Sequence, residues 1–166
     1  MTKSLNSLAE AAVLMAERAV VALVEAEAGL NQAAQLIKND AKIRIGHYQD
    51  SAGPFPEWAE LADSTEAEKE RLGYQLDAPL LREGDLRDSI VTEQHGLEAV
   101  VGSKMAIAAY QEFGTDRIPP RPFLGPAAYE RKDAIKAIVG KFTVKGLVGG
   151  SAIHPSLGYD ITPSQE

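Results

Sequence analysis

Asp85 and Asp88 form the pattern in this sequence that comes closest to a catalytic acid–base pair, because two carboxylates on one short turn can share a proton. Arg82 and Arg87 lie beside them along the chain, and ion pairs around a tight turn account for the same four residues. Two hypotheses follow: a small hydrolase that uses these carboxylates, and a salt-bridged turn without chemistry. We favour the second.

Glu112 is a further carboxylate of interest, because it lies in the apolar run over residues 110–114 and could be a buried acid. The hydrolase hypothesis would use Asp85, Asp88 or this glutamate as its carboxylate. Pairing with an arginine such as Arg121 is the more economical interpretation, since a buried carboxylate needs a partner.

Metal and nucleophile chemistry finds little support. The sequence has no cysteine, which excludes disulfides, thiol catalysis and thiolate zinc sites. The 3 histidines (His47, His95 and His154) fall on a predicted helix, a turn and the tail, and no two have metal-ligand spacing. Nucleophile elbows, phosphate loops and dinucleotide fingerprints are also missing. We therefore expect a protein that is not an enzyme and takes no cofactor.

Residues 5 to about 48 are predicted to be helical, since they contain no proline and carry apolar side chains at the helical period. Gly29 leaves open whether they form one very long helix or two. The apolar positions are rich in alanine, which lets another helix approach closely but buries little area per residue. Because a lone helix of this kind is marginal in water, it needs a partner surface, from the rest of the chain or from another subunit.

Glycines mark the turns in the middle of the chain. A hydroxyl of Ser64 or Thr65 can cap a short helix that ends at Gly73. Gly84 indicates a second turn, and Asp85 can cap the short helical segment that leads from it into a strand.

A β-hairpin is predicted next, from two apolar-rich runs between residues 89 and 102. A two-residue turn at His95-Gly96 would set Glu93 opposite Glu98, an unfavourable contact that leaves the register open. A short helix over residues 105–113 should then stop at Gly114.

Three prolines force the strip over residues 118–124 into an extended form, because proline forbids helix and removes amide donors. Residues 127–139 have the pattern of a surface helix. The residues after Gly140, which include Phe142, are expected to form a flexible arm, or one that orders only against a partner.

Together these elements predict an α+β fold with a small, mostly antiparallel β-sheet and flanking helices. We expect a long N-terminal helix or helical hairpin over residues 1–49, a core over 50–145 and an extended C-terminal arm over 146–166. With 166 residues, 45% of them hydrophobic, the chain suits one structural domain. No apolar run reaches the roughly 18 residues of a membrane span, and the acid-bearing N-terminus is unlike a secretory signal, so we expect assembly in a cytoplasm.

Charge is unevenly distributed within a net charge of −7. Residues 51–95 carry 4 basic and 11 acidic side chains, whereas residues 96–145 carry 8 and 5. This balance argues against a primary DNA-binding domain, which relies on a basic face. An acidic zone beside a basic one suits a chain that contacts copies of itself head to tail.

Two segments together resemble a known family. Residues 79–90 read PLLREGDLRDSI, and residues 110–126 read YQEFGTDRIPPRPFLGP, with the predicted hairpin between them. In this order they resemble the head–tail joining proteins of tailed bacteriophages, also called neck or tail-completion proteins, and the related virion morphogenesis family. An upstream segment of that family, WxxLAxST-like, is matched by Trp58, Leu61, Ala62, Ser64 and Thr65.

The resemblance, which covers about residues 50–140, implies a virion protein of the neck, assembled in the host cytoplasm. Its copies would form a six-fold ring that joins the head to the tail and leaves a channel for DNA. The implied partners are other copies of the chain, a head-closure or connector protein, and a tail terminator or tail tube protein. DNA would be only passing cargo, and no membrane is involved.

The proline-rich strip is the predicted docking element of such a ring. Phe123 and Leu124 would be its apolar anchors and Arg121 its charged fork, unless they pack on the chain's own core. The candidate contact residues are Arg82, Asp85, Arg87, Glu112, Phe113, Arg117, Pro119, Pro120, Arg121, Pro122, Phe123 and Leu124. A different class of function remains open: an interaction module, assembly chaperone or regulator whose long helices pair into a dimer.

Overall fold

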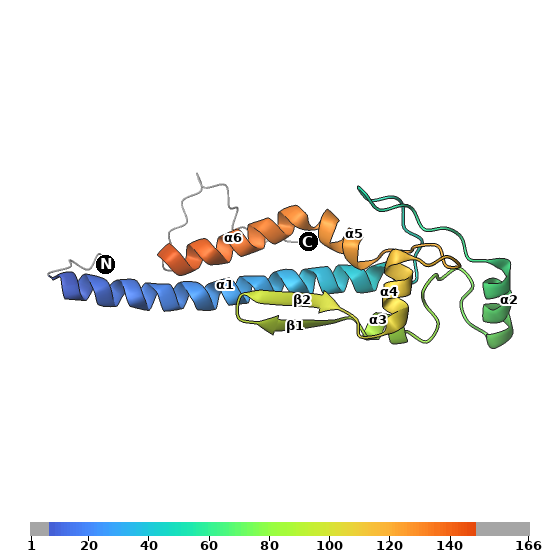
Figure 1. Ribbon diagram of the computed structural model, residues 1–166, viewed down its shortest axis with the longest axis horizontal. Helices are drawn as coiled ribbons and strands as arrows, with labels where there is room; N and C mark the ends of the chain where they lie inside the picture. Colours follow the sequence, from blue (N-terminus) through green and yellow to red (C-terminus); the bar gives the residue numbers. More distant parts are fainter. Residues whose placement is uncertain (1–6, 149–166) are drawn as a thin grey trace, which may run out of the picture.

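The computed structural model describes residues 7–148 and has the predicted α+β architecture. Figure 1 shows an elongated molecule built along α1, with α6 on one side of that helix and the β-hairpin on the other. The short helices α2, α3 and α4 gather near the end where α1 stops. In chain order the elements are α1 (Leu8–Arg44), α2 (Asp63–Leu72), α3 (Asp85–Asp88), β1 (Val91–His95), β2 (Glu98–Gly102), α4 (Ala106–Phe113), α5 (Leu124–Glu130) and α6 (Lys132–Val148).

The N-terminal region is one helix, because Gly29 serves packing instead of ending α1. A Cβ atom at Gly29 would lie 2.7 Å from the Cβ of Phe142 on α6. Likewise, a Cβ atom at Gly146 would lie 2.5 Å from the Cα of Ala22. The two glycines therefore let α1 and α6 approach closely, and a larger side chain at either position would separate them.

The expectation of an arm after Gly140 is wrong for the residues that the structure describes. The helix α6 continues through Gly140 to Val148, and Phe142 packs against α1. Contact with α1 outweighs the low helix propensity of the glycines. The rest of the predicted arm, residues 149–166, lies outside the described residues.

An ion-pair network with a buried centre joins α1 to the junction of α5 and α6. The carboxylate of Asp40 accepts from Arg44 one turn later at 2.8 Å and from Arg131 at 2.8 Å. Arg44 also pairs with Glu130 at the end of α5. The network was not predicted, although the four-residue spacing of Asp40 and Arg44 was a usable signal.

The hairpin is confirmed, but its turn and register differ from the expected ones. The two residues between the strands are Gly96 and Leu97, and Glu93 lies opposite Val100, not Glu98. Glu93 instead pairs with Lys104 at 2.7 Å, which removes the predicted repulsion. Gly96 takes a φ of +56°, so the glycine supplies the left-handed backbone that a tight hairpin turn requires.

Both predicted helix caps in the middle of the chain are wrong, while the predicted ends are right. The cap of α2 is Ala62, without a side-chain hydrogen bond, so neither hydroxyl caps it. Gly84 itself caps α3 at a φ of +100°, and Asp85 is the first helical residue. Gly73 ends α2 in the left-handed conformation, and Gly114 follows α4 as expected.

The core lies where the C-terminal end of α1 meets α3, α4 and α5. Ala41 and Ile45 from α1 pack there with Trp58, and with Ile90 next to β1 and Phe123 before α5. The indole N–H of Trp58 donates to the carbonyl oxygen of Pro122 at 3.0 Å, so this buried polar group is satisfied. The core thus fixes the proline-rich strip from one side.

Candidate functional site

The proline-rich strip is bound to its own chain. The guanidinium of Arg121 donates to the carbonyl oxygens of Ala59 and Glu60 at 2.9 and 2.8 Å, and its burial lowers the pKa of Arg121. Pro122 is buried, and Phe123 is fully buried at 0% exposure. Arg121, Pro122 and Phe123 therefore pack on the core of their own chain, which is the second of the two alternatives predicted for this strip. Pro119 and Pro120 remain exposed.

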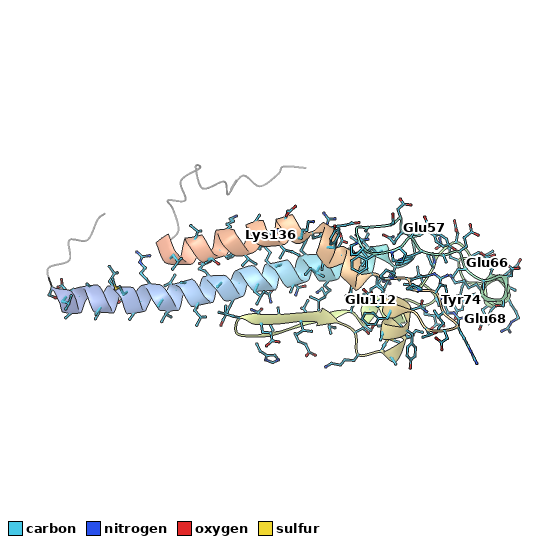
Figure 2. All side chains as sticks on the ribbon, turned by 45° about the horizontal axis from the view of Figure 1, so that its top comes forward. Glu57, Glu66, Glu68, Tyr74, Glu112 and Lys136 are labelled. Carbon is cyan, nitrogen blue, oxygen red and sulfur yellow. The ribbon has the colours of Figure 1, made fainter. Side chains whose placement is uncertain are left out.

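Glu112 does not pair with Arg121, so that prediction is wrong. Figure 2 labels it beside the core, where its carboxylate accepts backbone N–H groups instead. The donors are Phe123 at 2.8 Å, Leu124 at 3.0 Å and Gly125 at 2.7 Å. These N–H groups belong to the first turn of α5, so Glu112 on α4 caps α5 from a distance in sequence.

This arrangement predicts a structural penalty for Glu112→Ala. The change leaves three half-buried N–H groups without an acceptor and should lower the free energy of unfolding by about 1–3 kcal/mol. Glu57→Ala, at an exposed glutamate, is the matched control and should change it by less than about 0.5 kcal/mol. Urea unfolding followed by the fluorescence of Trp58, the one tryptophan, measures both. Equal effects of the two variants would contradict the capping role.

The predicted ion pairs around the α3 turn are only partly present. Arg87 pairs with Asp88 at 3.2 Å, as expected for a salt-bridged turn. Arg82 instead pairs with Glu68 on α2 at 2.7 Å, and thereby ties the turn to that helix. The two aspartates thus differ in their surroundings, and Asp85 faces a cleft.

This cleft has a volume of about 780 Å³ and lies at the α2–α4 end of the molecule. It is formed by both segments that carry the family resemblance, residues 79–90 and 110–126. Its apolar lining comes from Leu61, Leu80, Leu81, Leu86, Met105, Ile107, Ile118 and Pro119, and its polar lining from Glu60, Lys69, Tyr74, Arg82, Glu83, Asp85, Gln111, Arg117 and Arg121.

Besides Arg121, two polar groups at this cleft have shifted pKa values. The ammonium of Lys69 is almost completely buried and donates to the carbonyl oxygens of Gln75 and Ala78. Burial, and secondarily the charge of Arg82, lowers the pKa of Lys69. The hydroxyl of Tyr74 donates to Glu83 at 2.7 Å, and this hydrogen bond raises the pKa of Tyr74. Sequence reasoning assigned no role to Lys69, because a lysine in a charged helix looks solvent-exposed.

Two backbone and side-chain features of the cleft are unusual. Leu80 adopts a φ of +63°, a left-handed conformation that costs energy for a residue with a branched side chain. Within residues 7–148, the side-chain oxygen Oε1 of Gln111 is buried without a hydrogen-bond partner. Both residues line the cleft, so a strained backbone and a hydrogen-bond acceptor without a donor occur in the same part of the molecule.

The N-terminal half of α1, residues 8–24, is the second surface of interest. Its contact with α6 stops near Ala22, and Figure 2 shows side chains on the rest of this half with no helix or strand beside them. Large apolar side chains there are 43–90% exposed, namely Leu8, Val13, Met15, Val20, Val21, Leu23 and Val24. Within residues 7–148, the predicted need for a partner surface is therefore met only for the C-terminal half of α1.

Comparisons with protein-family models, curated proteins and solved structures give no match to this chain. Among the residues that the structure describes, no helix is both long and apolar enough to span a bilayer. The same residues contain no group of three or more His, Cys, Asp or Glu side chains that could hold a metal ion. The function must be argued from the cleft and from the exposed half of α1.

Proposed function

We propose that the chain is a non-enzymatic structural protein of the bacteriophage neck. Its copies form a ring that joins the head connector to the tail and leaves a channel for DNA. The observation that carries this proposal is the exposed apolar half of α1, over residues 8–24. Exposed apolar side chains in this number are unfavourable in water and are typical of a protein–protein contact.

The placement of the two resembling segments supports the same function. Residues 79–90 and 110–126 are separated by the hairpin in sequence, but both line one cleft. Family motifs that meet at one surface are more readily explained by a shared contact than by separate roles in folding.

Charge supports contacts between unlike surfaces. In Figure 2, Glu57, Glu66 and Glu68 lie at one end of the molecule, whereas Lys136 lies well along α6. Together with the acidic balance of residues 51–95 and the basic balance of residues 96–145, this separation suits a heterologous interface, in which each copy presents unlike surfaces to its two neighbours. Such an interface repeats until the rotation closes a ring.

The rival function is a helical-dimer interaction module or an assembly chaperone. The exposed half of α1 favours it too, because two copies could pair these helices antiparallel and bury the same side chains. The two functions differ in symmetry: a dimer is closed by one isologous contact, and a ring by repeated heterologous contacts.

Mass measurement and electron microscopy of the purified full chain distinguish these functions. We expect particles larger than a dimer with a central opening, six copies being the number that the resemblance implies, alone or after addition of phage connectors. A species that stays dimeric in both conditions would support the interaction module. A stable monomer that never joins connectors would overturn both proposals.

A further inference from the structure

We propose that the cleft binds the C-terminal segment of a neighbouring copy, centred on residues 157–161, as an extended peptide. The inference deepens the proposed function and rests on it, since it names a second contact between neighbouring copies, beside the one proposed for the N-terminal half of α1. It is carried by the cleft lining, by the sequence outside the described residues and by the length of chain available.

The segment has the chemistry of a strand with one apolar face. Leu157, Tyr159 and Ile161 alternate along the sequence, so in an extended chain all three side chains point to the same side. Asp160 then points to the opposite side. Pro155 and Pro163 flank the segment and disfavour helix, which reduces the conformational freedom lost on binding.

The cleft offers what such a segment needs. Leu80, Leu81 and Ile107 belong to an apolar lining that can accept alternate side chains. Gln111 lines the same cleft, and its buried oxygen Oε1 has no donor among the described residues, so a bound backbone N–H would supply the missing hydrogen bond. Arg117 is exposed at the cleft, and its guanidinium makes no ion pair within residues 7–148, so it can meet Asp160.

Chain length favours a neighbouring copy, because within one chain even a fully extended stretch would bring Leu157 only to the near edge of the cleft. The C-terminal part of α6 packs near Ala22, and the cleft begins near Leu81, which lies against Gly46 just beyond the end of α1. From Ala22 to Arg44 the helix alone rises about 33 Å. The stretch from Val148 to Leu157 spans at most about 32 Å when fully extended. Figure 1 also places α6 on the side of α1 opposite α3 and α4, so a path within one chain would be longer still.

Disulfide cross-linking tests the contact directly, because the natural sequence has no cysteine. Full chains carrying Tyr159→Cys are mixed with full chains carrying Ile107→Cys, a half-exposed cleft position, and oxidised mildly. The matched control replaces the second chain by Leu97→Cys, an exposed apolar residue in the hairpin turn. We expect the cleft pair to link at least about tenfold faster than the control pair, since docking raises the effective concentration.

A charge swap supplies the second measurement. Arg117→Asp should slow the cross-link by roughly two- to fivefold, the range expected for an exposed ion pair. Asp160→Arg on the other chain should restore it. Equal rates for the cleft and control pairs would overturn the proposal. So would a link formed only within one chain, when both cysteines are placed on the same copy.

The copy number, measured on the same samples, separates this inference from the proposed function. Assemblies larger than a dimer without the cleft cross-link would overturn the docked segment and leave the ring intact. A chain that never assembles would overturn both the docked segment and the ring.

Discussion

Phe123→Ala is expected to lower the free energy of unfolding by about 3–5 kcal/mol, the usual cost of removing a fully buried phenylalanine ring. Phe123 has 0% exposure and lies in the core with Trp58 and Ile90. The loss combines the transfer of the ring out of an apolar environment with the cavity left behind, which the rigid strip cannot easily fill. Urea unfolding followed by Trp58 fluorescence measures it.

Phe113→Ala is the matched control, because it removes the same side chain ten residues earlier in the sequence. Phe113 is 82% exposed at the end of α4, so its truncation should cost less than about 0.5 kcal/mol. The two positions also distinguish a role in folding from a role in binding. The exposed Phe113 ring can contact a neighbouring protein, whereas the buried Phe123 ring cannot. A loss of less than 1 kcal/mol for Phe123→Ala would show that the strip is not held by this core.

Local sequence patterns identified the elements well, and the exceptions have a common physical cause. The helical period over residues 8–44 and the glycine stop after Phe113 are properties of neighbouring residues. Gly29 and Gly140 gave misleading signals, because propensity treats a glycine as a break, while contact between α1 and α6 makes a close approach favourable. Contacts distant in sequence decided both cases.

At the candidate site, too, the sequence pointed to the important residues but not to their partners. Glu112 was recognisable as a carboxylate in an apolar run, but its real partners are three backbone N–H groups, which carry no residue-type signal. Arg121 was recognisable as a charge in a rigid strip, but its acceptors are the carbonyl oxygens of Ala59 and Glu60. Side chain–backbone contacts at long range could not be predicted from one sequence.

The cleft could not be predicted from such local patterns. Neither residues 79–90 nor residues 110–126 has a periodicity that points to the other, yet residues of both segments line one cleft. The features that distinguish this cleft, the strained Leu80 backbone and the unpartnered Gln111 oxygen, depend on backbone angles and burial. They could be found only in three dimensions.

The exposed half of α1 leads to the second large prediction. Val13 and Val20 lie seven residues apart, on one face of the helix, and are 59% and 63% exposed. Val13→Asp together with Val20→Asp should weaken association between copies at least about 100-fold, because each buried valine contributes about 1.5–3 kcal/mol to a contact. Sedimentation velocity over a range of concentrations measures the effect.

Folding should survive this double change, since the described core lies at the other end of α1. Helix content and the urea midpoint are expected to stay close to those of the unchanged chain. Ile43→Asp is the matched control: it places an aspartate at a 71% exposed apolar position of the same helix, outside residues 8–24, and should leave association unchanged. If the double variant assembles like the unchanged chain, the N-terminal half of α1 is not the contact surface, and the ring loses its main support.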